Sequence, residues 1–325
     1  MNLPGRAMPY SRGMKNIFVL GGTGFVGAHV CEQLVRAGWQ ITVPTRRRVN
    51  AQAIQHLPGL TVLELDVHDE AALTRAMAGH SAVINLVAIL HGDAATFAKI
   101  HVHLVEKIAR ACLVNGVAQL VHVSALGADS ARMTTAPSYY LRSKSAAEAV
   151  LVQVASASDA LRVSLLRPSV IFGANDQFMN VFAKLQSIFP FIPLAGADAR
   201  FQPVWVYDVA QASVRVLGLP PGAGAVQTWE LVGPDVMRLR DLVYMAGVLS
   251  GAGAGKGRPI FGLPMWAARI QAFFMELAPG APLMSRDNLD SMLVDNVATA
   301  GMPGLAQLGI TAAAIEPVAR GYLSR

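Results

Sequence analysis

Apolar runs and helix-like segments alternate along the first half of this chain, and that alternation restricts the fold more than any other feature. Short apolar runs, typical of buried strands, are followed by segments whose apolar residues recur three and four positions apart. Because each parallel strand must be reached by a crossover, this pattern predicts an α/β protein with a doubly wound parallel sheet. The predicted strands are Lys15–Leu20, Gln40–Pro44, Leu60–Asp66, Ala82–Leu90, Leu120–Ser124 and Arg162–Arg167, and the predicted helices are Phe25–Ala37, Ala51–Leu57, Glu70–Met77, Thr96–Val114 and Tyr139–Ala155.

The chain divides into three predicted parts. Residues 1–14 contain prolines and arginines but no apolar run, so we expect a disordered tail. Residues 15–173 are predicted to form a Rossmann domain. After Pro168 the alternation weakens and prolines accumulate, so residues 174–325 are predicted to form a smaller C-terminal lobe. Some elements of this lobe should return to the sheet, notably Asp208–Leu217, with Asp208 as the helix N-cap.

The composition excludes several classes of protein. Of the 325 residues, 53% are hydrophobic and 15% are charged, which excludes a disordered chain or a coiled coil. The net charge of +6 is scattered, so we expect no nucleic-acid-binding face. No run of about 18 apolar residues occurs, so no transmembrane helix is expected. A cytoplasmic location is predicted, with a peripheral position at the inner membrane as the alternative.

The cysteines and histidines do not form a predicted metal site. Cys31 and Cys112 lie in separate helical segments, and the eight histidines lack the spacing of metal ligands. We expect both thiols to be buried, because free cysteine is among the most buried residue types.

A glycine-rich loop joins the first predicted strand to the first predicted helix. Gly21 permits a tight turn, Gly24 lets a pyrophosphate approach the backbone, and Gly27 allows the helix to pack closely on the strand. The helix N-terminus adds unpaired N–H groups and the positive end of its dipole. The loop therefore predicts a dinucleotide site, with loop contacts at Gly21, Thr23, Gly24, Phe25, Val26 and Gly27.

Arginines, and no acid, follow the second predicted strand. The run Arg46–Arg48 stands where an NAD-type site usually has a carboxylate for the ribose 2′-hydroxyl. Guanidinium groups suit a 2′-phosphate, so Arg46 and Arg47 favour NADP(H) over NAD(H). Further predicted contacts are Asp66 and Val67, which would bracket the adenine, and Leu86, Val87 and Ala88, which would pass under the adenosine ribose and the diphosphate.

Three side chains predict proton chemistry at the carboxyl edge of the sheet. Ser124 ends the fifth predicted strand, and Tyr140 and Lys144 lie four residues apart on the next helix. A neighbouring ammonium can stabilise a phenolate, so Lys144 would activate Tyr140 as acid/base and hold the nicotinamide ribose. Ser124 would hydrogen-bond the oxygen of a substrate. These three are the predicted catalytic residues.

These motifs resemble the short-chain dehydrogenase/reductase superfamily, in the extended and atypical branch that contains NAD-dependent epimerases and dehydratases. The resemblance implies that backbone at Pro168 and Val170 approaches the nicotinamide carboxamide. It rests on Gly21–Gly27, Asp66, Ser124, Tyr140–Lys144, Arg167–Gly173 and Pro203–Ala210.

A second set of segments is similar to the NAD(P)H-binding accessory subunits of respiratory complex I and their bacterial relatives. That resemblance implies a tightly held NADPH with a structural role, and a respiratory complex or a membrane surface as partner. Animal members often lack the tyrosine that this chain keeps as Tyr140. The alternative is a free-standing NADP-dependent reductase, epimerase or dehydratase acting on a small carbonyl, a sugar nucleotide or an isoprenoid. The segments are Val43–Arg47, Asn85–Leu90, His122–Ala128, Asp176–Phe178 and Ala281–Leu289.

Phe261–Leu277 is an apolar stretch with Arg269 and Glu276 as its charged residues. A core helix of the C-terminal lobe is the favoured interpretation. A helix lying on a membrane or on a partner is the alternative.

Overall fold

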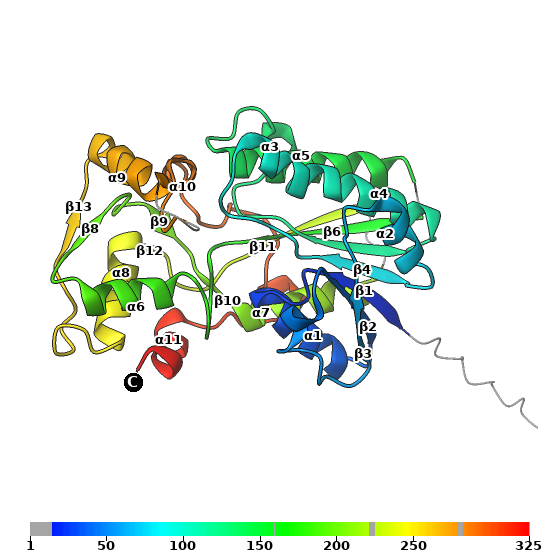
Figure 1. Ribbon diagram of the computed structural model, residues 1–325, viewed down its shortest axis with the longest axis horizontal. Helices are drawn as coiled ribbons and strands as arrows, with labels where there is room; N and C mark the ends of the chain where they lie inside the picture. The colour runs from blue at the N-terminus through cyan, green and yellow to red at the C-terminus, as the bar shows by residue number, and fades with distance from the viewer. Residues whose placement is uncertain (1–14, 159, 221–224, 278–281, 325) are drawn as a thin grey trace, which may run out of the picture.

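Seven parallel strands form the central sheet, in the order β11-β6-β5-β4-β1-β2-β3 (Figure 1). The structure is a computed structural model that describes residues 15–158, 160–220, 225–277 and 282–324, so the predicted tail at 1–14 lies outside it. The strand order reverses between β1 and β4, which confirms the predicted doubly wound sheet. The strands are β1 (Asn16–Leu20), β2 (Gln40–Thr45), β3 (Leu60–Glu64), β4 (Ala82–Asn85), β5 (Gln119–Val123), β6 (Arg162–Pro168) and β11 (Val226–Leu231).

Helices cover both faces of this sheet (Figure 1). On one face, Leu34 and Val209 share a buried cluster with strand residues, and on the other face Leu73, Ile108 and Leu151 do the same. Strand β1 is buried on both sides, which explains its continuous apolar sequence. The first face carries α1 (Phe25–Arg36) and α7 (Val206–Arg215), and the second carries α2 (Glu70–Ala76), α4 (Leu104–Val114) and α5 (Tyr139–Ser156).

Two predicted elements differ in the structure. The predicted helix Ala51–Leu57 is wrong: a 3₁₀ turn covers Arg48–Ala51 and further turns follow it. A seven-residue segment without a capping side chain gives too few hydrogen bonds to offset helix nucleation. The predicted strand Ala82–Leu90 ends at Asn85, because the Asn85 side chain accepts a hydrogen bond from the Val87 N–H and turns the chain out of the sheet.

The predicted helix Thr96–Val114 is one helical run with a change of hydrogen-bond pattern inside it. It begins as α3 (Ala94–Phe97), whose first turn is capped by the Asp93 side chain. A π-helical segment, Ala98–His103, then leads into α4. Such π segments occur frequently at functional sites.

The C-terminal half returns to the sheet, as predicted. Strand β11 adds to β6, and α7 packs beside α1. Asp208 is wrong as the N-cap, because α7 starts earlier, at Val206, with Trp205 as its cap residue. Asp208 lies in the first turn, where its buried carboxylate accepts a hydrogen bond from the Ala313 N–H at 2.9 Å.

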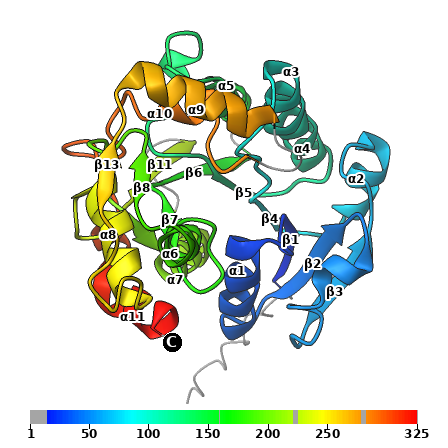
Figure 2. The ribbon, with the colours of Figure 1, turned by 60° about the vertical axis from the view of Figure 1, so that its left-hand side comes forward.

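The remaining elements form the smaller lobe, which lies beside the large one in Figure 2. Its core joins Phe172, Met179, Leu242 and Ala319. Three two-stranded sheets support it: β7 (Ile171–Phe172) with β10 (Val204–Trp205), β9 (Arg200–Phe201) with β12 (Met237–Arg238), and β8 (Ile192–Leu194) with β13 (Ile260–Gly262). Its helices are α6 (Met179–Ile188), α8 (Leu239–Leu249), α9 (Met265–Leu277), α10 (Arg286–Ser291) and α11 (Ile315–Leu323). The boundary between residues 173 and 174 stays a prediction.

The apolar stretch Phe261–Leu277 is not a core helix, so that prediction is wrong. It contains the end of β13 and the whole of α9, and the buried residues of α9 are Ala268 and Ala272. Its large apolar side chains face outward, with Trp266 70% exposed. Over the part of the chain that the structure describes, no helix is both long and apolar enough to cross a membrane.

Candidate functional site

The glycine loop after β1 is packed so closely that two of its glycines have no room for a side chain. Gly21 has a φ of +77°, and a Cβ there would lie 3.0 Å from the carbonyl carbon of Leu86. A Cβ on Gly27 would lie 2.1 Å from the Gly21 carbonyl oxygen. The loop therefore lies against the backbone that follows β4, which brings the predicted contacts at Leu86 and Val87 beside Gly21.

Helix α1 begins at this loop without a capping side chain. Gly24 is its N-cap residue, with extended backbone and no side-chain hydrogen bond to the first turn. The Gly24 N–H donates to the Gly21 carbonyl at 3.0 Å, which closes the turn beneath the helix end. The first-turn N–H groups of α1, at Phe25, Val26 and Gly27, are thus left for a ligand, which fits a pyrophosphate.

Arg46 and Arg47 follow β2 directly and are exposed. Neither forms an ion pair with any residue that the structure describes. The neighbouring strand β3 ends at the same level, since Thr45 pairs with Glu64. Unpaired guanidinium groups at this edge suit an anionic group on the adenosine half of a dinucleotide.

Asp66 and Val67 follow β3 at the same edge. The exposed Asp66 carboxylate accepts a hydrogen bond from the His68 N–H at 3.0 Å, and Val67 packs partly into the core. Burial lowers the pKa of His68, Asp66 opposes that shift, and nearby cations that include Arg46 lower the pKa further. Arg46 and Asp66 therefore lie close enough to act on one imidazole ring.

Ser124, Tyr140 and Lys144 each lie near the carboxyl end of β5. The Lys144 Nζ donates to the Val123 carbonyl at 3.0 Å, and Tyr140 packs against a cluster that contains Ala125. Ser124 is 3% exposed, and its Oγ has no hydrogen-bond partner among the described residues. A buried hydroxyl with no partner is costly unless a ligand or water completes it.

Burial controls the titration of this cluster. It lowers the pKa of Lys144 to about 8, against the opposing effect of Glu148. It also raises the pKa of Tyr140 to about 12, so the phenol is protonated at neutral pH. The predicted role of Lys144 in stabilising a phenolate stays a prediction, since the bond to the Val123 carbonyl uses only one of its three N–H donors.

His101 contacts the candidate site and was not predicted from the sequence. It lies in the π segment, 2% exposed, with its ring centroid 5.7 Å from that of Tyr140. The ring accepts from the Ile89 N–H at 3.0 Å through Nε2, so Nδ1 donates to Ser143 Oγ at 2.8 Å. Burial, with a smaller effect of Lys144, lowers the pKa of His101 to about 3, so this tautomer is neutral. His101 thereby joins the segment after β4 to the helix that carries Tyr140.

Asp287 is a second residue at the site that sequence reasoning missed. Its carboxylate accepts from the Tyr139 N–H at 2.6 Å and from the Tyr140 N–H at 3.1 Å, at the N-terminus of α5. Ser291 and Ser138 also share a hydrogen bond of 2.8 Å between their hydroxyls. Helix α10 therefore holds the N-terminus of α5. The only signal in the sequence was the position of Asp287 within the Ala281–Leu289 segment.

Pro168 and Val170 lie where β6 leaves the sheet. The Pro168 carbonyl accepts from the Leu126 N–H at 2.9 Å, and the Val170 N–H donates to Asn296 Oδ1 at 3.1 Å. Gly173, three residues after Val170, lies beside the start of α1, because a Cβ on Gly173 would lie 3.4 Å from the Phe25 ring. The segment that follows β6 therefore reaches the start of α1, and the nicotinamide contacts at Pro168 and Val170 stay predictions.

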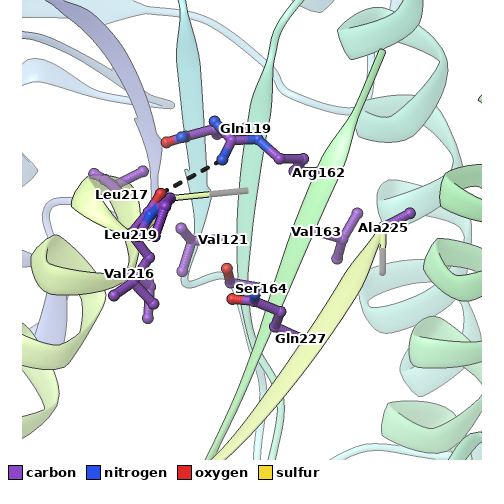
Figure 3. A pocket seen from close by; sticks show the side chains of 11 residues that line it. Gln119, Val121, Arg162, Val163, Ser164, Val216, Leu217, Leu219, Ala225 and Gln227 are labelled. Atoms are coloured by element: carbon purple, nitrogen blue, oxygen red, sulfur yellow. Dashed lines mark hydrogen bonds between the residues drawn. The ribbon is translucent and has the colours of Figure 1, made fainter. Parts of the chain in front are cut away.

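The cavity in Figure 3 lies at the opposite end of the sheet. It is lined by Gln119 and Arg162 at the amino ends of β5 and β6, and by Leu219, whose carbonyl accepts from Arg162 at 3.5 Å. Its volume of about 20 Å³ is room for about one water molecule. It therefore has no part in a dinucleotide site.

The described residues contain no group of three or more histidine, cysteine or acidic side chains that could hold a metal ion. Cys31 and Cys112 are buried, as predicted, and burial raises the pKa of each thiol to about 12.

Residues 17–229 match the model of the NAD dependent epimerase/dehydratase family. The chain is 33% identical over 231 residues to the mitochondrial "NADH dehydrogenase [ubiquinone] 1 alpha subcomplex subunit 9" of Arabidopsis thaliana, covering 69% of this chain but only 55% of that relative. It is 30% identical to the Mus musculus protein of the same name, covering 92% of this chain and 77% of that one.

Solved structures show the same fold at low sequence identity. The structure titled "MoeE5 in complex with UDP-glucose and NAD" has a TM-score of 0.70 at 18% identity, covering 95% of this chain and 97% of that one. The structure of gox2253 has a TM-score of 0.72 at 20% identity, with the same coverage.

Proposed function

Because the chain belongs to the NAD dependent epimerase/dehydratase family, we propose that it binds NADP(H) and holds it as a structural cofactor, in the manner of a complex I accessory subunit. One observation carries the proposal. The uncapped N-terminus of α1, enclosed by Gly21 and Gly27, lies at the same sheet edge as the unpaired Arg46 and Arg47.

The arginines support NADP(H) rather than NAD(H). A 2′-phosphate on the adenosine ribose would meet Arg46 and Arg47, which form no ion pair with any described residue. A 2′-hydroxyl needs an acceptor, and the residues directly after β2 supply none. Asp66, on the next strand, is left to border the adenine.

The proton state of Tyr140 is one argument for a structural role, although the pKa of Lys144, lowered by burial to about 8, lies closer to neutral pH. When bound, the cofactor supplies a hydride, but a catalytic acid/base needs a pKa near the working pH. Burial raises the pKa of Tyr140 to about 12, so its hydroxyl is a hydrogen-bond donor. Tyr140 and Lys144 then hold the ribose on the nicotinamide side, and Ser124 Oγ completes its hydrogen bonding with the bound ligand.

The similarity to mitochondrial subunits supports a place for the chain on a respiratory complex at the inner membrane. The names of these relatives describe complex I subunits, and the matched region includes both lobes of this chain in the mouse protein.

A free-standing reductase, epimerase or dehydratase is the second candidate. The observation that favours it is the complete Ser124–Tyr140–Lys144 set, with a buried Ser124 Oγ that has no partner in the described chain. A purely structural site does not require a hydroxyl in that position.

Cofactor exchange separates the two candidates. The full chain is purified without added nucleotide, denatured, and the released dinucleotide is quantified. Stoichiometric NADPH that does not exchange over hours supports the structural role, because such a cofactor need never leave. A site that arrives empty and binds NADPH reversibly at micromolar levels supports the enzyme.

Matched variants test the residues. Arg46→Asp should weaken NADPH binding more than NADH binding, whereas Arg36→Asp, an equal charge change on the exposed end of α1, should affect neither. Equal binding of NADPH and NADH by the wild type would contradict the cofactor choice. Tyr140→Phe should leave cofactor content nearly unchanged and should abolish any turnover that the enzyme candidate shows.

A further inference from the structure

Helix α9 exposes its large apolar side chains and buries only small ones, the reverse of an ordinary surface helix. Its buried face consists of Ala268 and Ala272, which pack on Leu289. A surface helix normally buries its large apolar side chains and exposes its polar ones. Here the large side chains are exposed: Trp266 70%, Ile270 51%, Phe273 45%, Phe274 64% and Leu277 66%.

These side chains form a stripe along one side of the helix. Trp266, Ile270, Phe273 and Leu277 are spaced four, three and four residues apart, which places them on one face over three turns. The helix lies at the edge of the small lobe in Figure 1, and in Figure 2 it crosses the top of the molecule from the β13 side. We call this stripe, together with Phe274, the α9 face.

Further exposed aromatic residues precede α9 along β13. Phe261 is 58% exposed, and its ring centroid lies 5.9 Å from that of Phe191, which is 51% exposed. Exposed apolar patches of this extent on soluble proteins mark interaction sites.

Two acidic side chains of α9 and α10 form ion pairs with arginines on the same two helices. Glu276 pairs with Arg286 at 2.8 Å, and Asp290 pairs with Arg269 at 2.8 Å. The α9 face therefore presents no uncompensated negative charge from these two helices, apart from Asp287, which is engaged at the N-terminus of α5.

A cationic pocket lies at the start of β13. Its volume is about 390 Å³, and Arg240, Lys256 and Arg258 line it, with Asp241 as the acid among its lining residues. The strand residue Ile260 forms one wall and is followed directly by the exposed Phe261.

Two guanidinium nitrogens at this pocket lack partners. The Nε atoms of Arg240 and Arg258 are buried and have no hydrogen-bond partner among the described residues. Arg240 Nη2 is paired with the exposed Asp198 at 2.9 Å, so that contact leaves its Nε unused. Buried donors without acceptors are uncommon in folded proteins, so the two nitrogens call for an explanation such as a water or an ion.

We propose that the pocket and the α9 face together dock the small lobe onto a membrane that contains anionic phospholipid. A phosphate of a lipid headgroup accepts hydrogen bonds from Arg240 and Arg258 and is attracted by Lys256. The α9 face enters the boundary between headgroups and acyl chains, where tryptophan is favoured. The net charge of +6 adds attraction to an anionic surface.

Two alternatives fit less well. A free phosphate would explain the arginines but not the neighbouring exposed aromatic residues. A second copy of the chain would cover the aromatic residues but would leave the cationic pocket unexplained.

Vesicle binding by the full chain tests the proposal. The protein is floated with phosphatidylcholine vesicles, with and without phosphatidylglycerol, at low and high salt. We expect binding to the anionic vesicles alone, weakened by salt because the contact is largely electrostatic. Equal binding to neutral vesicles, or none to either, would overturn the proposal.

Matched variants separate the two parts of the surface. Lys256→Gln and Arg258→Gln should each weaken binding about fivefold, and Arg36→Gln, the same charge change on α1, should weaken it much less. Trp266→Glu with Phe274→Glu should abolish binding. Val114→Glu, at a residue 74% exposed on α4, should leave it intact. Equal losses in the control variants would contradict the proposal.

Two other measurements exclude the remaining occupants. If the wild type fails to bind vesicles but dimerises with rising concentration, and Trp266→Glu abolishes dimerisation, the surface is an interface between copies. If inorganic phosphate binds the pocket while vesicles do not, the site takes a free anion. NADPH content is measured on every variant as a control for folding, because these side chains are not among the predicted cofactor contacts and the content should not change.

Discussion

Helices α4 and α9 have similar lengths, 11 and 13 residues, and opposite relations to their surroundings. Helix α4 buries Leu104, Val105 and Ile108 against the sheet. Helix α9 buries two alanines and exposes its aromatic residues to solvent. An apolar helix is thus part of the core in one lobe and part of the surface in the other.

The difference between α4 and α9 shows that the burial of a helix's apolar side chains depends on the surface that lies beside the helix. Helix α4 is placed over seven strands, which offer a wide apolar surface. Helix α9 lies at the edge of the small lobe, where α10 and a two-stranded sheet cover only a narrow strip of its surface. That strip contains only alanine side chains. The small lobe therefore keeps apolar surface available for contacts outside the chain.

The largest expected effect concerns charge in the two regions. Glu148 is fully buried and pairs with Arg167 at 2.6 Å, so Glu148→Gln leaves a mostly buried cation without its charged partner. We expect a loss of about 3–5 kcal/mol in the free energy of unfolding, measured by urea titration. Glu276→Gln removes the half-exposed pair beside α9 and should cost less than about 1 kcal/mol. Similar losses of unfolding free energy in the two variants would contradict the difference between the two regions.

Apolar side chains provide the next test. Ile108→Ala, in the packed face of α4, should lower the free energy of unfolding by about 2–5 kcal/mol through a lost contact surface and a cavity. Trp266→Ala removes a larger side chain from α9 but should change stability by no more than about 0.5 kcal/mol. A large loss for Trp266→Ala would mean that α9 is packed in solution.

A pH titration separates the regions further. His101 and His122 are buried in the large lobe, and burial is the first cause that lowers the pKa of each, to about 3 for His101. The unfolded chain binds a proton near its ordinary pKa of about 6.5, whereas the folded chain does not, so stability is full above that pH and falls as the pH drops toward 3.

For each ring the loss is about 1.4 kcal/mol per pH unit below the unfolded pKa. His101→Gln should therefore make unfolding less sensitive to a change from pH 7.5 to 5.5 by about that amount. Helix α9 contains no histidine, so Trp266→Ala should leave the pH dependence unchanged. An unchanged slope in His101→Gln would contradict the neutral assignment of that ring.

The smallest effect concerns the contact that joins the two regions. Asp287→Ala removes the carboxylate that accepts from Tyr139 and Tyr140, which should cost about 1 kcal/mol as the loss of a helix cap does. Ser291→Ala, one turn further along α10, should cost less. If Asp287→Ala alone unfolds in two separate transitions, the two lobes unfold independently once this contact is lost.

Local patterns predicted the large lobe well, because its strands are buried on both faces and its glycine loop performs a backbone task that few other residues can do. Lys15–Leu20 and the Gly21–Gly27 loop are examples. The end of β4 was missed because it depends on a hydrogen bond between Asn85 and Val87, which no periodicity records.

Contacts between distant residues were beyond such patterns. The capping of α5 by Asp287 joins positions 148 residues apart, and the π segment that carries His101 has the apolar spacing of an ordinary helix. The burial of α9 was predicted wrongly. An apolar sequence shows that a helix favours apolar surroundings, but it does not show whether the same chain has an apolar surface to pack against it. The roles of Ser124, Tyr140 and Lys144 stay predictions.

The hydrogen bond from Tyr139 to Asp287 also affects the order in which the chain can fold during synthesis. A ribosome adds about 5–20 residues per second, so Asp287 emerges about 7–30 s after Tyr139. Strand β11 completes the edge of the sheet during that interval, and α10 can cap α5 only after it. The helix that carries Tyr140 therefore acquires its final N-terminal contact near the end of synthesis, and a nascent chain halted before residue 287 would display a complete sheet with an unfinished site.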